Sequence, residues 1–74
     1  MAKKDNYKTV LMMNRVVNLK CDDEVLKCKY VNVEGKGWGT WHINGEDTGM
    51  QVSALINHLR DKYLSITVIY KRQY

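Results

Sequence analysis

The chain has 74 residues, which is room for one small domain with one modest hydrophobic core. Hydrophobic residues make up 45% of it, too many for a disordered segment, and twelve Lys and Arg against eight Asp and Glu give a formal charge of +4. A deep catalytic cavity would take up much of so small a core, so the composition favours a non-enzymatic binding module. We expect a single domain over residues 1–74, with residues 1–6 forming a mobile basic N-terminus.

The sequence shows neither a secretory signal nor a membrane span. No apolar stretch of the signal-peptide kind follows the basic start, and the apolar run at residues 10–13 is far shorter than the ~20 residues that a span needs. We therefore expect a cytoplasmic protein without a membrane partner. If a phage encodes the chain, the compartment is the host cytoplasm.

The first half of the chain is expected to form strands. Residues 7–13 are predicted to be a strand or the start of a long first strand, in a register that the pattern does not fix. A hairpin follows. If residues 22–23 form a two-residue turn, antiparallel pairing places Leu19 opposite Leu26.

A second hairpin is predicted to turn at residues 34–37. A four-residue loop there places Tyr30 opposite Trp41 and Cys28 opposite Ile43. The two hairpins agree on which residues share a face, and this agreement predicts the buried face of the sheet. Its members are Val17, Leu19, Leu26, Cys28, Tyr30, Trp41 and Ile43.

The clearest element is a helix at about residues 49–63. Thr48 and Gln51 form a capping-box pattern with Thr48 as the N-cap, and apolar residues then recur at helical spacing along one stripe. Residues 64–71 alternate and are rich in β-branched side chains, which predicts a strand. The residues expected to face inward are Leu64, Ile66, Val68 and Tyr70. The predicted fold class is α+β, an antiparallel sheet of four to five strands with one amphipathic helix packed on one face.

The opposite face of this sheet carries the main functional signal. Lysines bind phosphates, and an exposed indole such as that of Trp38 offers a flat surface on which an unpaired base stacks. We expect this face to bind RNA or another single-stranded nucleic acid, with Asn18, Thr40 and His42 hydrogen-bonding bases or sugars. The candidate nucleic-acid-binding residues are Asn18, Lys20, Lys27, Lys29, Lys36, Trp38, Thr40, His42 and Lys71. Lys71 belongs to this set if the last strand joins the sheet in register.

One short segment resembles a known family. Residues 29–34, Lys-Tyr-Val-Asn-Val-Glu, followed by Lys-Gly-Trp-Gly at residues 36–39, are similar to the first RNA-binding strand pair of cold-shock domains. The resemblance implies that Tyr30 and Trp38 stack on bases and that Lys36 contacts a phosphate. The hairpin register, by contrast, places Tyr30 on the covered face. We take the resemblance as an indication of surface chemistry.

Metal, disulfide and catalytic sites are poorly supported by the sequence. In the hairpin register Cys21 and Cys28 lie roughly 13 Å apart, at ~3.3 Å per residue, which is too far for a disulfide. Zinc would need both cysteines to converge with the histidines, so we expect two core thiols instead. His42 could act as a general base on RNA, but no acid is predicted beside it. We expect no metal, no cofactor and no enzymatic activity.

Two alternatives to nucleic-acid binding stay open. The lysines could simply keep a sheet face soluble, with Trp38 folded over an edge. The chain could also be a protein-binding regulator or inhibitor, for instance phage-encoded against a host factor, that acts by occlusion or by edge-strand pairing. The surface of Met12, Met50, Val31 and Val33 would then matter more than the lysines. A free strand at the sheet edge also leaves self-association open.

Overall fold

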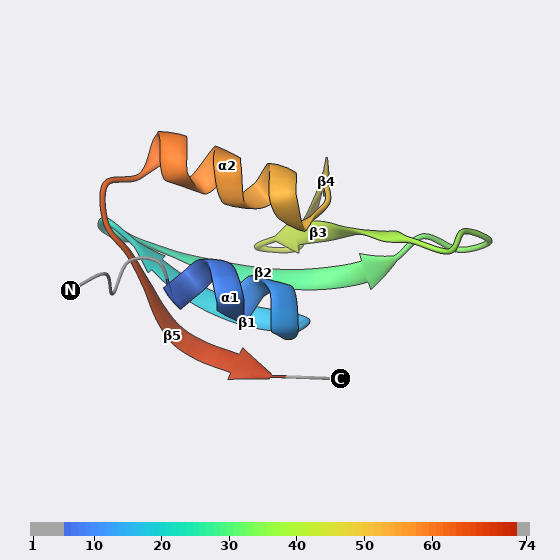
Figure 1. Cartoon of the computed structure of the whole chain (residues 1–74), viewed down its shortest axis with the longest axis horizontal. Helices are drawn as coiled ribbons and strands as arrows, with labels where there is room; N and C mark the ends of the chain where they lie inside the picture. Colours follow the sequence, from blue (N-terminus) through green and yellow to red (C-terminus); the bar gives the residue numbers. More distant parts are fainter. Residues whose placement is uncertain (1–5, 73–74) are drawn as a thin grey trace.

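The computed structural model describes residues 6–72, which form one five-stranded antiparallel sheet and two helices (Figure 1). The elements in chain order are α1 (Asn6–Met13), β1 (Val16–Cys21), β2 (Glu24–Asn32), β3 (Gly39–Ile43), β4 (Glu46–Met50), α2 (Val52–Lys62) and β5 (Ile66–Arg72). The strand order in the sheet is β4-β3-β2-β1-β5. The predicted α+β class with a helix packed on an antiparallel sheet is confirmed. Of the expected mobile N-terminus, residues 1–5 lie outside the described residues, and Asn6 begins α1.

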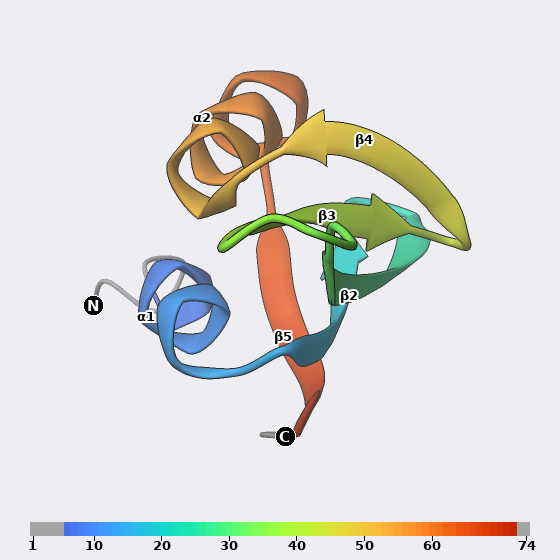
Figure 2. The same ribbon diagram turned by 90° about the vertical axis from the view of Figure 1, so that its right-hand side faces the viewer.

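Both hairpins have the predicted register. Leu19 lies opposite Leu26 in the β1–β2 pair, and Tyr30 lies opposite Trp41 in the β2–β3 pair. The seven residues predicted for the buried face all contribute to the core, five of them buried and Tyr30 and Ile43 half-buried. Both helices pack on this face of the sheet, as Figure 2 shows, so the opposite face is left uncovered by them.

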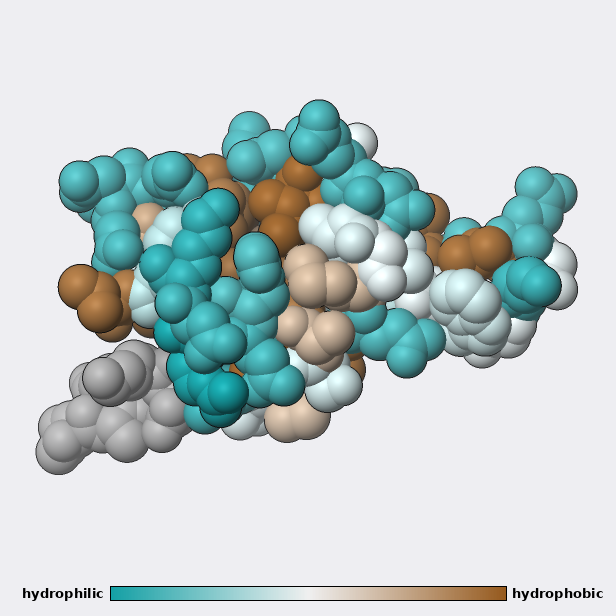
Figure 3. All heavy atoms as spheres, turned by 90° about the horizontal axis from the view of Figure 1, so that it is seen from above, coloured by the Kyte–Doolittle hydropathy of each residue, from teal (hydrophilic) through white to brown (hydrophobic). Residues whose placement is uncertain are grey.

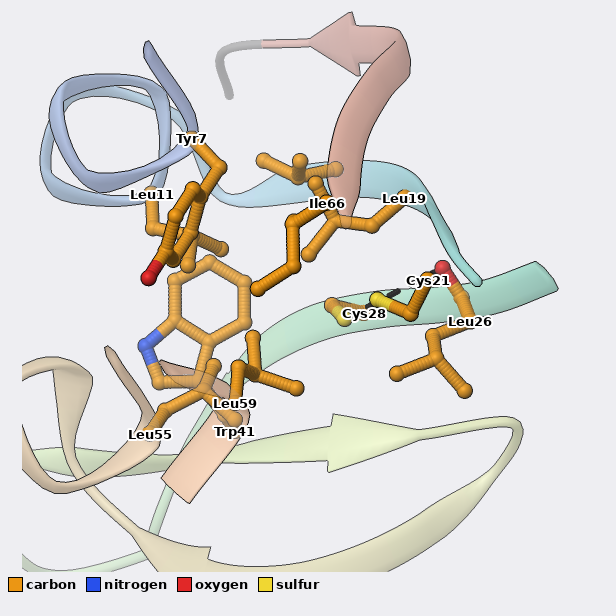
Figure 4. Close-up of a cluster of buried hydrophobic side chains, with 11 residues drawn as sticks. Tyr7, Leu11, Leu19, Cys21, Leu26, Cys28, Trp41, Leu55, Leu59 and Ile66 are labelled. Carbon is orange, nitrogen blue, oxygen red and sulfur yellow. Dashed lines mark hydrogen bonds between the residues drawn. The ribbon is translucent and has the colours of Figure 1, made fainter. Parts of the chain in front are cut away.

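The prediction of a strand at residues 7–13 is wrong, because this segment forms α1. Tyr7 and Leu11 are four residues apart, so a helix brings both side chains to one face, and both are buried in the core (Figure 4). The helix ends at Met13, and the backbone N–H and Nδ2 of the next residue, Asn14, both donate to the carbonyl oxygen of Val10. A short apolar run does not distinguish helix from strand by its periodicity, and here the contacts with the sheet and α2 decide.

The second helix begins three residues later than predicted. Its N-cap is Gln51, which makes no side-chain capping hydrogen bond. Thr48 lies in β4 instead, where its hydroxyl donates to the carbonyl oxygen of Trp41 at 2.6 Å. Pairing of β4 with β3 extends to Met50, so the sheet takes up the residues that would have formed the capping box. The prediction of Thr48 as N-cap is therefore wrong, although the buried stripe of the helix, which includes Leu55, is confirmed.

The last strand contains an irregularity that changes which of its residues face the helices. Leu19 pairs with Val68, whereas the preceding residue Asn18 pairs with Tyr70. Ile69 is thus the extra residue of a β-bulge. Residues directly opposite each other share a face, so Tyr70 lies on the uncovered face beside Asn18. Its predicted inward position is wrong.

On the N-terminal side of the bulge, the predicted inward positions are correct for Ile66 and Val68 but not for Leu64. Ile66 is buried and Val68 packs against the core, as expected. Leu64 is almost fully exposed, because the strand has not yet begun there. The chain turns at this point, and the N–H groups of Leu64 and Ser65 donate to the carboxylate of Asp22 at 3.4 and 2.9 Å.

Neither helix within residues 6–72 is long and apolar enough to cross a membrane.

Candidate nucleic-acid interface

The uncovered face of the sheet presents its side chains in rows that run across neighbouring strands. The four rows are Thr67–Lys20–Val25, Tyr70–Asn18–Lys27, Arg72–Val16–Lys29–His42–Asp47 and Val31–Thr40. The three lysines of these rows are exposed. The pairing therefore brings Asn18, Lys20, Lys27, Lys29 and His42 of the predicted set onto one surface.

A shallow hollow of about 440 Å³ lies in the middle of this face. Lys27, Lys29, Asn18 and His42 line it together with Val16 and Val31, and no carboxylate is among its lining residues. The rim next to Lys27 is fixed by the β3–β4 turn. The backbone N–H of Lys27 donates to Oδ1 of Asn44, and the N–H of Asn44 donates back to the carbonyl oxygen of Lys27, both at 2.9 Å. The hollow thus combines two ammonium groups with an apolar surface.

A polar cluster lies at the β4 end of the same face. Oδ1 of Asp47 accepts hydrogen bonds from the Thr40 hydroxyl and from the Gly49 N–H, each at 2.8 Å, and lies 3.8 Å from Nε2 of His42. These contacts, the bond from Gly49 first, lower the pKa of the Asp47 carboxyl below its ordinary value. Thr40 is buried and its hydroxyl is committed to Asp47, so it does not present a free donor to a base. Asp47 is the acidic neighbour of His42 that the sequence did not predict.

Trp38 and Lys36 lie apart from the lysine rows. They belong to the β2–β3 loop, which projects beyond one end of the molecule (Figures 1 and 3). Lys36 is exposed there. Trp38 is 46% exposed and lines a different hollow, of about 460 Å³, with Met50 and Gln51 where β4 leads into α2. The indole expected to stack bases is therefore not part of the lysine-lined hollow.

The bulge in β5 moves Lys71 to the helix side of the sheet. Lys71 pairs with Val17, whose side chain is in the core, and it lines a hollow with Thr9 and Val10 of α1. Its expected position among the outer lysines is therefore wrong. In exchange the bulge brings Tyr70, 47% exposed, to the outer face. The regular alternation of residues 64–71 gave no signal of the bulge, so the sequence reasoning missed Tyr70.

Tyr30, to which the cold-shock resemblance gave a stacking role, lies on the face that the helices cover. Its ring meets that of Trp41 edge to face, with centroids 5.7 Å apart, and the Arg15 guanidinium carbon lies 5.2 Å from its centroid. Its hydroxyl accepts the N–H of Gly39 at 2.7 Å. A Cβ on Gly39 would collide with the carbonyl oxygen of Val31. The close approach of β3 to β2 therefore explains why residue 39 is a glycine.

The cysteines are buried free thiols, as expected. Burial is the main cause that raises the pKa of Cys21 to about 11 and that of Cys28 to about 12. Within residues 6–72, no group of three or more His, Cys, Asp or Glu side chains could hold a metal ion. The thiols therefore belong to the core and have no part in the outer face.

Comparisons with known proteins give no match to this chain, whether with protein-family models, with curated proteins or with solved structures. An α+β fold by itself does not specify a function, because one fold supports many functions. The function therefore has to be inferred from the side chains of the outer face.

Proposed function

We propose that the chain is a small, non-catalytic module that binds a single strand of nucleic acid, RNA or DNA, on the uncovered face of its sheet. The observation that carries this proposal is the set of side chains on that face. Lys20, Lys27 and Lys29 are exposed on two adjacent strands, and two of them line a hollow without carboxylates. The half-exposed ring of Tyr70 lies in the same row as Lys27.

An unpaired strand suits this surface because its bases and its phosphates can be bound side by side. Stacking of one base on an aromatic ring contributes ~1–3 kcal/mol, and lysines neutralise phosphates. Tyr70 and Lys27 are separated by β1 alone, roughly 10 Å at ~4.8 Å per strand spacing. A base on Tyr70 and a phosphate on Lys27 would therefore belong to the same short segment of the nucleic acid.

The distribution of charge favours one side of the sheet. The lysines lie on β1 and β2, whereas Asp47 on β4 places a carboxylate beside His42. A polyanion would be repelled by Asp47, so we expect the strand to follow β5, β1 and β2 and to avoid the β4 edge. The proposed interface consists of Asn18, Lys20, Lys27, Lys29 and Tyr70, and His42 marks its border toward the β4 edge.

The proposal is tested by titrating labelled single-stranded RNA, single-stranded DNA and duplex DNA with the protein at several salt concentrations. For single strands, log K should fall linearly with log salt by about 0.7 for each phosphate contact. The double variant Lys27→Gln/Lys29→Gln removes two such contacts, so its slope should be shallower by about 1.4. Its affinity at low salt should also be weaker.

The matched control is Arg60→Gln/Lys62→Gln. This pair removes the same formal charge from exposed positions in the last turn of α2, which packs on the other face of the sheet. Its slope should stay close to that of the unmodified protein. Equal losses in the two double variants would show that only net charge matters, and no binding of any nucleic acid at low salt would refute the proposal.

A second candidate function, a protein-binding regulator or inhibitor, is favoured by one observation. β5 is an edge strand of the sheet and carries Ile69 and Tyr70, both about half exposed. A partner could add a strand at this edge. The surface predicted for this role is not continuous, because Met12 lies on α1 whereas Val31 lines the outer hollow. Binding of a protein at β5 would survive the Lys27→Gln/Lys29→Gln change, which separates the two functions.

A further inference from the structure

On the helix side of the sheet, a hollow of about 440 Å³ opens between the end of α1 and the start of α2. It is lined by residues 11–15, Tyr30, Trp41, Gln51 and Val52. Sites for small molecules in proteins have volumes of ~300–1,000 Å³, so this hollow is large enough for a small ligand. It lies on the face opposite to the lysine rows, so a ligand bound here would be independent of nucleic-acid binding.

One of the lining residues has an unsatisfied hydrogen-bond donor. Trp41 is 2% exposed, and its indole N–H has no hydrogen-bond partner among the described residues. In Figure 4 the indole nitrogen lies at the edge of the core cluster, on the side of the Tyr7 hydroxyl and away from the cysteines. An unpaired buried donor costs ~1–3 kcal/mol, and an indole N–H can only donate. A ligand with an acceptor atom would recover this cost.

Two further features of the hollow favour negative charge. The guanidinium group of Arg15 lies over the ring of Tyr30, and its side chain is exposed. The N-terminus of α2 lies at Gln51 and Val52, with neither a side-chain capping bond nor an acidic residue in its first turn. Free N–H groups at a helix N-terminus carry about half a positive charge. No Asp or Glu is among the residues that line the hollow.

The remaining lining is apolar and sets the rest of the ligand's chemistry. Leu11, Met12 and Val52 contribute aliphatic side chains to the hollow. We propose that it binds a small carboxylic acid with an apolar tail. The carboxylate pairs with Arg15 and, once the side chains that enclose the Trp41 nitrogen move to admit it, accepts a hydrogen bond from the indole N–H, while the tail packs against the aliphatic side chains. Inorganic phosphate would leave the apolar surface uncovered, and an alcohol would leave the positive charge unpaired.

The indole N–H groups report directly on this site by ¹H–¹⁵N NMR. The chain has two tryptophans, and the variant Trp38→Phe identifies the signal of Trp41. Titration with octanoate should shift the Trp41 signal and saturate with a Kd of about 1 mM or tighter. Octanol and inorganic phosphate, each of which has only half of the required chemistry, should bind at least about tenfold more weakly.

Variants of Arg15 test the charge of the site. Arg15→Gln should weaken octanoate binding about tenfold, whereas Arg15→Lys, which keeps the charge, should weaken it less. Arg60→Gln, which removes an exposed guanidinium at the far end of α2, should leave it unchanged. An unmoved Trp41 signal, an equal response to octanol, or unaltered binding in Arg15→Gln would each overturn the proposal. The comparison of octanoate with octanol uses the unmodified protein and needs no variant to fold.

Discussion

Replacing Leu11 with Ala tests whether α1 belongs to the core, which is the main point on which the structure departs from the sequence prediction. Leu11 is 2% exposed and lies in the cluster that contains Trp41 and Leu59. The change removes three carbon atoms, worth about 2.4 kcal/mol at ~0.8 kcal/mol each. The cavity left behind adds to this, so we expect a loss of about 3 kcal/mol in the free energy of unfolding. Both residues favour helix, so helix propensity offsets little of the loss.

A loss of this size would be easy to measure in a domain of 74 residues. The expected stability at this length is on the order of 4–11 kcal/mol. Each kcal/mol lowers the midpoint of thermal unfolding by about 4–8 °C in domains of this size, so a fall of roughly 12–24 °C is expected. Urea unfolding followed by circular dichroism should show a lower midpoint with an unchanged m-value.

The neighbouring residue supplies the control. Met12 lies in the same helix but is 63% exposed, so Met12→Ala should change the stability by no more than about 0.5 kcal/mol. If Leu11→Ala costs less than about 1 kcal/mol, or no more than Met12→Ala, then α1 does not pack into the core and the reasoning is refuted.

Three other features predict measurable effects. Gly39→Ala should destabilise the domain by about 1–3 kcal/mol or more because its Cβ meets the β2 backbone, whereas Gly37→Ala, where a Cβ meets nothing within 4 Å, should be tolerated in the same urea assay. Tyr70→Leu should weaken single-strand binding by about 5- to 140-fold, while Tyr70→Phe, which keeps the ring, should bind as tightly as the unmodified protein. The thiols of Cys21 and Cys28 hold their protons more tightly when folded, so the stability they contribute is complete below their ordinary pKa of 9.0 and is lost as the pH rises toward about 12. Cys28→Ala should reduce this dependence of the unfolding free energy on pH, and an unchanged pH profile would contradict the assignment.

The sequence predicted the two hairpins correctly because each register was checked against the other. A two-residue turn and a four-residue loop placed the same side chains on one face, and β2 is shared by both hairpins. The same registers also predicted which lysines lie on the outer face. They alternate along β1 and β2 with buried residues such as Leu19 and Leu26.

The features that the sequence did not predict depend on pairing and packing with other elements, which the pattern of each segment alone does not show. A short apolar run became α1 because Tyr7 and Leu11 find a partner surface in the sheet and in α2. Thr48 was taken into β4 by its pairing with β3 instead of capping α2. The bulge at Ile69 follows from how β5 pairs with β1, and the alternation of β5 alone does not reveal it.

The β-bulge in β5 also changed which residues belong to the candidate site. One extra residue in a strand exchanges the faces of everything after it, so the bulge removed Lys71 from the outer surface and added Tyr70 to it. Trp38 has the side chain best suited to stacking, but it belongs to a loop that lies away from the lysine rows. The lysines on the outer face could be predicted from the sequence, whereas the aromatic side chain that lies beside them could not.

Alternation along two central strands keeps the two proposed sites chemically separate. Lys29 and His42 face outward, and the adjacent Tyr30 and Trp41 face the helices, so the two surfaces are divided by the thickness of one sheet. A substitution on one side of a strand leaves the contacts of its neighbours on the other side in place. Lys27→Gln/Lys29→Gln should therefore alter nucleic-acid binding without changing the response of the Trp41 signal to octanoate, and Arg15→Gln should do the reverse. Loss of both activities in either variant would mean that the substitution disturbs the sheet itself, and neither surface could then be assigned from it.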